Sequence, residues 1–338
     1  MNSKVGSNSN QSKKSNRKKV LITGATGFIG ANLCRALLKQ NHEVYALIRP
    51  NSNIWRIEEI KSRLRRVEIS LLDTEKLILE LSTVKPEWIF HCAAHGAYSW
   101  QTDVEQMIAT NVAATVNLLT AASKVGFESF VYTGSSSEYG FAKGSPNEND
   151  RLQPNSSYAV TKAAATHFCQ LFAQQYQLNI ATVRLYSVYG PYEQPGRLMP
   201  TLLLSLKNSR WPALVSPEVA HDFIYIDDVC NACIHLAGHQ LGEGEVYNLG
   251  TGKQTTMKQL VNLCQSLFPI TTKPEWSSMP NRFWDSSNWV ANVDKIKHTH
   301  NWQPKKSLSD GLQSYMSWFS ANPQLEDFYK QSLQAHQK

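Results

Sequence analysis

The 338-residue chain lacks any apolar run long enough to cross a bilayer, which excludes a membrane-spanning protein. Its N-terminal residues also lack the apolar segment that a secretory signal requires. Cysteine is sparse, and without a secretory signal we expect all six cysteines to stay reduced. These absences predict a soluble, cytoplasmic protein without structural disulfides.

Acidic residues are missing from positions 1–19, which hold six lysines and arginines. The formal charge of +7 therefore falls to +1 once this segment is set aside. Because the segment is rich in Ser, Asn and Lys and poor in apolar residues, we expect residues 1–19 to form a disordered basic tail. The basicity belongs to this tail, so we expect no nucleic-acid partner and no membrane partner.

A glycine-rich turn follows the first apolar segment of the body. Residues 20–22 predict a short buried strand, and Gly24, Gly27 and Gly30 recur at every third position after it. Glycines leave no side chain between the backbone and a bound anion, and apolar residues at helical spacing beyond them predict a helix whose N-terminal amides face a pyrophosphate. We expect Gly24 to make the tight turn, Gly27 to admit the phosphates, and Gly30 to open the helix and to let it approach the strand.

The residue after the second predicted strand, 43–48, bears on the choice of dinucleotide. An NAD site usually has an acidic residue there, which binds the ribose 2′-hydroxyl. This chain has Arg49, and a guanidinium pairs with a 2′-phosphate, so the position favours NADP over NAD. The alternative is a solvated arginine at a strand end, with NAD as the cofactor.

No set of residues in the sequence has the spacing of a metal site. Cys230 and Cys233 form the Cys-x-x-Cys pair, but two further ligands at similar spacing are missing, and the pair continues into apolar residues at helical spacing. We expect it to pack inside a helix. His91 and His95 lie at a strand end without a nearby acidic partner, and we expect them to line the cofactor site rather than to bind a metal.

Tyr158 and Lys162 lie four residues apart, which on a helix places both on one face. An ammonium near the phenol favours the phenolate and is expected to lower the pKa of Tyr158. Ser135 follows the predicted strand 129–133 and would hydrogen-bond a substrate oxygen and orient it toward Tyr158. A serine hydrolase is excluded, because the second glycine of a Gly-x-Ser-x-Gly elbow is missing after Ser135.

The glycine turn, Ser135 and the stretch Tyr158-Ala-Val-Thr-Lys162 together resemble the extended short-chain dehydrogenase/reductase family of nucleotide-sugar epimerases, dehydratases and reductases. The resemblance covers residues 20 to about 304. It implies an α/β fold, a Rossmann-type doubly wound parallel sheet with a smaller C-terminal substrate-binding lobe. We expect the dinucleotide-binding domain at 20–185, with 222–250 returning to it, and the lobe at 186–221 and 251–325.

The resemblance also implies the cofactor contacts. Besides the glycines they fall on Thr26, Phe28, Ile29, Arg49, Leu72, Asp73, Ala93, Ala94, Tyr158 and Lys162. Residues 67–73 would form the third strand and the adenine-contact loop, where Ser70 replaces the Asp of relatives. Residues 88–94 would form the fourth strand, whose small final residues leave room for the cofactor. Asn111 would open a long helix and support the catalytic strand, and the helices of Asn111 and Tyr158 would form a homodimer.

Substrate contacts implied by the resemblance are Ser136, Ser187, Arg197, His221 and Arg282. Relatives often have Asn at the position of Ser187, and they usually have an arginine that meets the diphosphate at the position of His221. We expect the guanidinium of Arg282 to make that diphosphate contact.

Two serines favour simple redox chemistry over loss of water. In the dehydratases that the chain resembles, the two positions after the catalytic serine or threonine carry acids, and here they are Ser136 and Ser137. Glu138 lies one place later, so a shift in register would restore an acid.

The resemblance thus implies an NAD(P)-dependent nucleotide-sugar epimerase of carbohydrate biosynthesis, which works by hydride transfer through a keto-sugar intermediate. The alternative is an NADPH-dependent reductase of nucleotide 4-keto sugars, which Arg49 favours. A 4,6-dehydratase of nucleoside-diphosphate hexoses ranks third. A non-catalytic NAD(P)-binding regulator is the hypothesis of a different class, and the intact set of Ser135, Tyr158 and Lys162 speaks against it.

Overall fold

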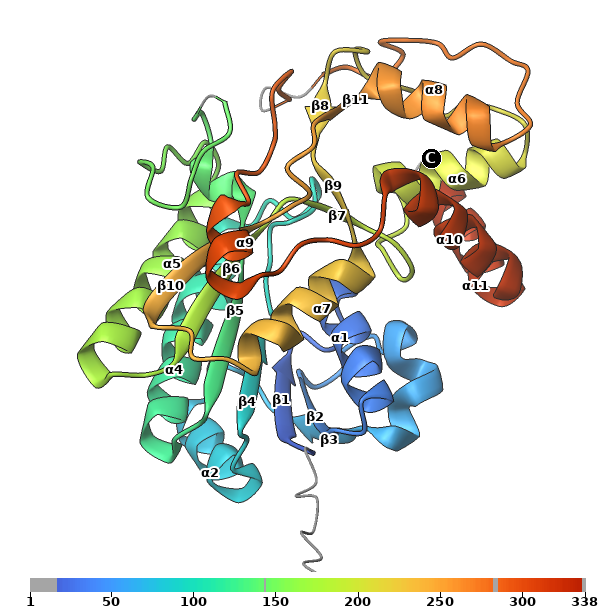
Figure 1. Cartoon of the computed structure of the whole chain (residues 1–338). Helices are drawn as coiled ribbons and strands as arrows, with labels where there is room; N and C mark the ends of the chain where they lie inside the picture. Colours follow the sequence, from blue (N-terminus) through green and yellow to red (C-terminus); the bar gives the residue numbers. More distant parts are fainter. Residues whose placement is uncertain (1–16, 143, 282–284, 336–338) are drawn as a thin grey trace, which may run out of the picture.

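A seven-stranded parallel sheet forms the centre of the molecule (Figure 1). The computed structural model describes residues 17–142, 144–281 and 285–335. The strands lie in the order β10-β6-β5-β4-β1-β2-β3. Their bounds are β1 Lys19–Thr23, β2 Glu43–Ile48, β3 Arg65–Glu68, β4 Trp88–His91, β5 Ser129–Ser135, β6 Ile180–Leu185 and β10 Glu243–Leu249. This order confirms the predicted Rossmann-type doubly wound sheet.

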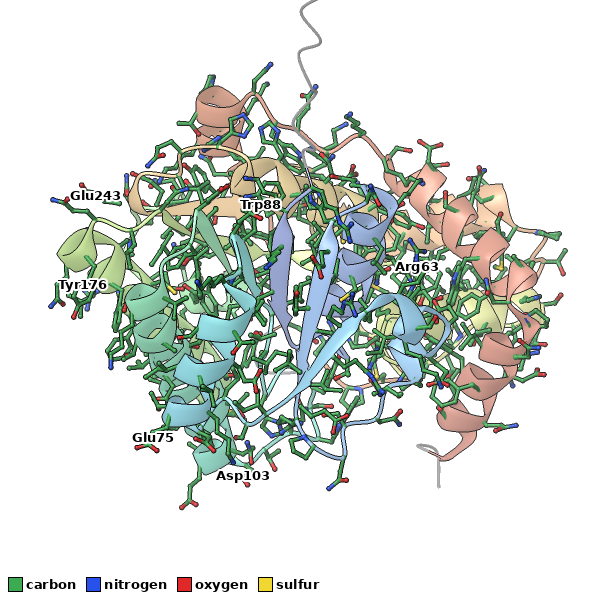
Figure 2. All side chains as sticks on the ribbon, turned by 90° about the horizontal axis from the view of Figure 1, so that it is seen from below. Arg63, Glu75, Trp88, Asp103, Tyr176 and Glu243 are labelled. Carbon is green, nitrogen blue, oxygen red and sulfur yellow. The ribbon has the colours of Figure 1, made fainter. Side chains whose placement is uncertain are left out.

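Helices cover both faces of this sheet. One face packs against α1 (Phe28–Lys39), α7 (Ile226–Ala237) and the 3₁₀ segment Trp55–Arg63, and the other against α2 (Thr74–Val84), α4 (Ala114–Val125) and α5 (Ser157–Tyr176). In β1, Val20 and Ile22 join the first core and Leu21 joins the second, because successive side chains of a strand point to opposite faces. In Figure 2, seen from below, Glu75 and Tyr176 mark the side of α2 and α5, and Arg63 lies on the other.

Two helices begin earlier than the sequence pattern predicts. Helix α1 begins at Phe28 with Gly27 as its N-cap, so Gly30 lies inside the first turn rather than opening the helix. The helix that holds Asn111 begins at Val104, as α3 (Val104–Met107), and continues through a π-helical stretch (Ile108–Ala113) into α4. Asn111 therefore lies within the π-helical stretch and does not open the helix.

Residues 67–73 divide into the end of a strand and a loop, as predicted, whereas the strand predicted for residues 88–94 is shorter. Strand β3 ends at Glu68, so Ser70, Leu72 and Asp73 lie on the loop that leads to α2. Strand β4 ends at His91, and Ala93 and Ala94 lie on the loop beyond it. Both loops leave the carboxyl end of the parallel sheet, where ligands of such sheets bind.

The C-terminal half adds a second layer of small sheets and helices beyond that edge (Figure 1). Strand β7 (Ser187–Tyr189) pairs with β9 (Phe223–Tyr225), and β8 (Ala220–His221) pairs with β11 (Thr255–Thr256). The helices of this layer are α6 Leu198–Lys207, α8 Met257–Leu267, α10 Leu308–Ala321 and α11 Pro323–Ala335, whereas α9 Asp294–His300 packs beside β10 of the central sheet. The domain boundaries given above stay a prediction.

Beyond Ser307 the sequence predicts one amphipathic helix followed by a polar tail, but a second helix, α11, follows the first. Tyr329 of α11 is fully buried, and its hydroxyl donates a hydrogen bond to the carbonyl of Glu193. Across the described residues, no helix combines the length and the apolar character that a bilayer span needs.

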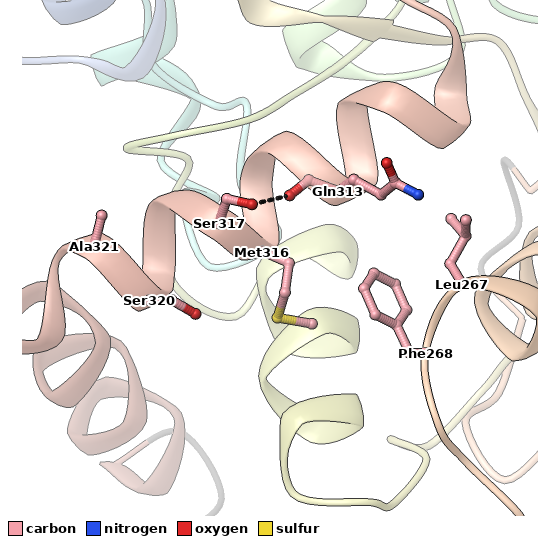
Figure 3. A pocket seen from close by; sticks show the side chains of 7 residues that line it. All are labelled: Leu267, Phe268, Gln313, Met316, Ser317, Ser320 and Ala321. Atoms are coloured by element: carbon pink, nitrogen blue, oxygen red, sulfur yellow. Dashed lines mark hydrogen bonds between the residues drawn. The ribbon is translucent and has the colours of Figure 1, made fainter.

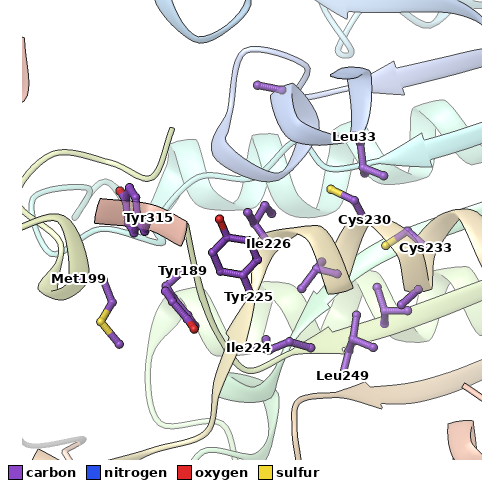
Figure 4. Close-up of a cluster of buried hydrophobic side chains, with 14 of the residues drawn as sticks. Leu33, Tyr189, Met199, Ile224, Tyr225, Ile226, Cys230, Cys233, Leu249 and Tyr315 are labelled. Carbon is purple, nitrogen blue, oxygen red and sulfur yellow. The ribbon is translucent and has the colours of Figure 1, made fainter. Parts of the chain in front are cut away.

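The Cys-x-x-Cys pair packs as predicted. Cys230 and Cys233 are buried and free in α7, where they lie in the same apolar cluster as Leu33 of α1 (Figure 4). Burial in this apolar cluster raises the pKa of both thiols. The pair therefore fills the space between two helices and is not poised for redox chemistry.

An open groove lies in the C-terminal half, between the end of α8 and helix α10 (Figure 3). Its lining residues are Leu267, Phe268, Gln313, Met316, Ser317, Ser320 and Ala321. None of the site residues predicted from the sequence lines this groove.

Candidate active site

The glycine turn joins β1 to α1. Gly24 has a φ of +66°, which L-residues with a side chain rarely adopt, and it makes the predicted tight turn. A Cβ on Gly30 would lie 2.2 Å from the carbonyl oxygen of Gly24, so this glycine allows the helix to approach the turn. No side chain caps α1 at Gly27. The free amides of the first turn and the helix dipole there favour a bound anion.

The predicted cofactor contacts outside this turn surround the same edge of the sheet. Arg49 follows β2 and is exposed, and Leu72 is half exposed in the loop after β3. Asp73 caps α2, because its carboxylate accepts a hydrogen bond from the amide of Lys76 and pairs with the ammonium of the same residue at 3.1 Å. Asp73 thus has a structural task in the first turn of α2, and its contact with a cofactor stays a prediction.

His91 is buried in the core and does not line the site, so this prediction is wrong. One ring nitrogen lies 2.6 Å from the hydroxyl of Thr23, and the other lies 2.8 Å from the hydroxyl of Thr115. Burial and the charge of Lys162 lower the pKa of His91 to about 3, so the ring is neutral. His95 is partly exposed, and its backbone is held at both ends by the side-chain amide of Asn111.

Asn111 ties the loop after β4 to the helix of the predicted catalytic pair. Its side-chain amide also donates a hydrogen bond to Thr161, between Tyr158 and Lys162 in α5. The predicted support by Asn111 therefore acts on the loop at His95 and on α5, and not directly on the catalytic strand.

The structure brings Ser135, Tyr158 and Lys162 together. Ser135 ends β5, and its side chain hydrogen-bonds with Tyr158 and accepts a hydrogen bond from the amide of Ser137. Lys162, one turn after Tyr158 in α5, is 1% exposed and donates a hydrogen bond of 2.6 Å to the carbonyl of Thr133 in β5. Its ammonium also lies 4.3 Å from the centre of the Tyr132 ring.

The expected lowering of the tyrosine pKa is not found. Burial raises the pKa of Tyr158 to about 12, and the hydrogen bond with Ser135 only partly opposes this effect. Burial also lowers the pKa of Lys162 to about 8. The ammonium is directed at the carbonyl of Thr133, so in the free protein it does not activate the phenol. An additional positive charge beside Tyr158 is needed to make it a base at neutral pH.

Glu138 belongs to a buried network below the catalytic loop. One carboxylate oxygen accepts a hydrogen bond from the amide of Ser135, and the other accepts hydrogen bonds from Thr166 and from Arg184, each at 2.9 Å. Glu138 is fully buried, and Arg184 also donates to the hydroxyl of Tyr139. Both carboxylate oxygens of Glu138 are thus engaged inside the protein, which argues against its use as an acid on a substrate.

Two predicted substrate contacts meet at the beginning of the C-terminal half. The hydroxyl of Ser187 in β7 lies 3.2 Å from a ring nitrogen of His221 in β8. The next residue, Asp222, is fully buried and binds the amides of Thr251, Gly252 and Ala291. Ser136 is buried directly after β5. Arg282 lies outside the described residues.

Arg197 precedes α6, and its positive charge partly opposes the rise in the pKa of Tyr158 that burial causes. Its guanidinium lies 6.0 Å from the ring centre of Tyr98. Tyr98 stacks on Trp100 in the loop after β4. No motif pointed to these two aromatic residues, since only the fold places their loop next to α6.

Glu193 and Arg56 are two further buried charged residues that the sequence analysis missed. Glu193 is 4% exposed, and one of its carboxylate oxygens has no hydrogen-bond partner among the described residues. Burial raises its pKa to about 8 despite Arg197 at 3.8 Å. The guanidinium of Arg56 donates to the carbonyls of Thr26 and Tyr192, and so connects the glycine turn with the loop after β7.

The site fits a dinucleotide because several of its hydrogen-bond donors have no partner among the described residues. The first turn of α1 has no side-chain cap, and a ligand phosphate would use its amides. An ammonium has three donors, whereas the structure gives the buried Lys162 one hydrogen bond within the described part of the chain. A ligand hydroxyl next to Lys162 would accept from the remaining donors.

Comparison with curated proteins finds relatives over most of the chain. A UDP-glucose 4-epimerase of Mycolicibacterium smegmatis is 29% identical over 313 residues, which are 89% of this chain and 98% of that protein. A human dTDP-D-glucose 4,6-dehydratase is 26% identical over 327 residues, covering 90% of this chain and 91% of the relative.

Solved structures of nucleotide-sugar enzymes also align with most of this chain. The UDP-glucuronic acid 4-epimerase of Bacillus cereus, in complex with UDP-glucuronic acid and NAD, aligns with a TM-score of 0.79 at 25% identity. The alignment covers 89% of this chain and 99% of the epimerase. The sequence profile of the NAD-dependent epimerase/dehydratase family matches residues 20–250, more than half of the chain. The chain therefore belongs to the NAD-dependent epimerase/dehydratase family.

Proposed function

We propose that this protein is an NAD-dependent nucleotide-sugar 4-epimerase that works through a keto-sugar intermediate. The observation that carries the proposal is the meeting of Ser135, Tyr158 and Lys162 at the end of β5, with serines at both positions after Ser135. The relatives named above support UDP-linked hexoses or hexuronic acids as substrates.

The glycine turn, the first turn of α1 and Lys162 would hold the dinucleotide. Bound NAD⁺ supplies a hydride acceptor and a positive charge. Tyr158 takes the proton of the sugar 4-hydroxyl, while Ser135 donates a hydrogen bond to that oxygen and fixes its direction. The 4-hydroxyl would thereby be oxidised to a 4-ketone, with the C4 hydrogen leaving as the hydride that the bound cofactor would accept. Tyr158 returns the proton after the keto sugar has turned, so that hydride adds to its other face.

The site supports redox chemistry without loss of water. Elimination needs an acid or base near C5 and C6 of the sugar, and Ser136 and Ser137 cannot supply it. Glu138, the remaining acid of this segment, is held by Ser135, Thr166 and Arg184. We therefore rank dehydration below epimerisation, although dehydratases are among the relatives.

Arg49 favours a second candidate, an NADPH-dependent reductase of nucleotide 4-keto sugars. Its exposed guanidinium follows β2, where a 2′-phosphate would lie. The solved relative named above holds NAD, so the comparisons do not support a preference for NADP.

We also propose that two copies of the chain associate through α3, its π-helical continuation and α5. Val104 and Ile108 are exposed apolar residues one turn apart, and α5 exposes Val160 and Leu171, which are three turns apart on one side of that helix. Light scattering should give a dimer for the wild type and a monomer after Val160→Glu together with Leu171→Glu.

A substrate panel tests the proposed activity. The purified protein is incubated with UDP-glucose, UDP-glucuronic acid or dTDP-glucose and NAD⁺, and the products are identified by NMR. A 4-epimerase converts a UDP sugar to its C4 epimer without net change in NADH. A 4-keto-6-deoxy product would instead show dehydration. In a separate incubation with NADPH and a nucleotide 4-keto sugar, oxidation of NADPH would show reduction. Cofactor binding without turnover in any incubation would favour a regulator.

A further inference from the structure

Three histidines gather where the C-terminal ends of α7 and α9 meet. His235 lies in the last turn of α7, His239 follows the C-terminus of α7, and His300 is the last residue of α9. One ring nitrogen of each lies within 4.8 Å of the other two. The rings of His235 and His239 have their centres 4.3 Å apart, and the ring of His300 stands nearly perpendicular to both.

From this arrangement we propose a transition-metal site at His235, His239 and His300, separate from the catalytic group. Imidazole nitrogens are ligands for zinc, copper and nickel rather than for magnesium or calcium. Three imidazoles with one water would complete a tetrahedral zinc site, in which the nitrogens stand about 3.3 Å apart. The rings therefore need to close by at most about 1.5 Å from their present positions.

The hydrogen bonds of the three rings match those of metal-binding histidines. One ring nitrogen of His235 donates to the carbonyl of His300, and one of His239 donates to the carbonyl of His235. A carbonyl can only accept, so these nitrogens carry the protons and the other nitrogen of each ring keeps its lone pair. Such bonds to the second nitrogen fix the orientation of metal ligands.

The hydroxyl of Tyr247 lies 2.9 Å from one ring nitrogen of His300 and can donate to it or accept from it, so this contact occupies one nitrogen without fixing which nitrogen carries the proton. Within the described part of the chain, the second nitrogen of each of the three rings makes no hydrogen bond. Each ring thus keeps one nitrogen for a ligand.

The electrostatic surroundings favour a cation. Helices α7 and α9 both end at the cluster, and the C-terminal end of a helix carries partial negative charge. Burial lowers the pKa of His300, the negative charge of Glu245 partly opposes this shift, and the Glu245 carboxylate forms an ion pair of 2.5 Å with Lys295. This ion pair offsets the charge of Lys295, while Lys297 and His298 share the last turn of α9 with His300.

A bound metal would fasten α9 to α7. The chain that follows α9 is already held to α7 by Trp302, whose indole donates to Asn231, and by Asp228, which accepts from the amides of Lys305 and Lys306. The three histidines would add a third link to this connection, which leads from the sheet to α10. The role is structural, because the cluster uses no residue of the proposed active site.

Zinc titration of the full-length, metal-free protein by calorimetry tests the site. We expect saturable binding of one zinc ion per chain, with affinity at least tenfold lower after His239→Ala or His300→Ala. His298→Ala is the matched control, because His298 is exposed in the same helix as His300 and lies outside the cluster. Its affinity should equal that of the wild type.

Cobalt provides an independent readout, since Co²⁺ in a tetrahedral site absorbs in the visible range. This band should appear with the wild type and His298→Ala and be lost with His239→Ala, which changes a side chain on the surface. Hydrogen exchange in residues 294–300 should slow with zinc only in the proteins that show the band. Equal zinc affinity of the wild type and His239→Ala, or no saturable binding by the wild type, would overturn the proposal.

Discussion

Replacing Glu138 distinguishes a structural carboxylate from a catalytic acid. The change Glu138→Gln leaves Arg184 charged in a place where both side chains are at most 3% exposed. Breaking a buried ion pair in this way costs about 3–5 kcal/mol of the free energy of unfolding. For a chain of this length, that loss lowers the melting temperature by about 4–7 °C. The carboxylate of Glu138 holds the amide of Ser135, so the variant should lose activity per folded molecule only to the extent that Ser135 is displaced.

The double variant Glu138→Gln/Arg184→Met isolates the interaction. Because it removes both buried charges, we expect it to be more stable than Glu138→Gln alone, and a double-mutant cycle measures the coupling. Thermal and urea unfolding measure the stability of each variant, and NMR measures the formation of the C4 epimer. The reasoning is refuted if Glu138→Gln keeps the wild-type melting temperature and yet loses all turnover, which is the behaviour of a catalytic acid.

Three further changes test the cofactor site and the buried lysine. Arg49→Asp should weaken binding of NADP⁺ relative to NAD⁺ in fluorescence titrations, and an unchanged ratio would remove the ribose assignment. Gly30→Ala places a methyl group against the Gly24 carbonyl and should abolish dinucleotide binding, whereas Gly238→Ala, with ordinary contacts, should bind like the wild type. Burial lowers the pKa of Lys162 to about 8, so the unfolded state binds more protons above that pH. Stability should therefore rise by about 2–3 kcal/mol between pH 8 and 10 in urea unfolding, and Lys162→Met should lack this rise.

The parts of the site that are local in sequence could be predicted. The turn at Gly24 depends on neighbouring residues, and the four-residue spacing of Tyr158 and Lys162 places them on one face of a helix. The doubly wound parallel sheet could also be predicted, because the glycine turn and the catalytic pair together are typical of one fold.

Two features of the site depend on long-range packing and could not be predicted from the sequence. The pKa of Tyr158 depends on burial and on the direction of the Lys162 ammonium, which the carbonyl of Thr133 takes. His91 was assigned to the site because it ends a strand, but Thr23 and Thr115 hold it in the core. Neither contact leaves a signal in the spacing of residues.

The clusters built from distant segments were equally hidden. Glu138 and Arg184 are 46 positions apart and meet only when β5 and β6 pair. His235 and His239 are four positions apart in the sequence, but His300 joins them from α9, 61 positions after His239.

The most direct test of the proposed chemistry is Tyr158→Phe. The protein is mixed with UDP-glucose and NAD⁺, formation of the C4 epimer is followed by NMR, and NAD⁺ affinity is measured on the same sample. The account predicts a wild type that epimerises the sugar and a variant that binds NAD⁺ nearly as well but turns over at least a hundredfold more slowly. A variant that epimerises at the wild-type rate would contradict it.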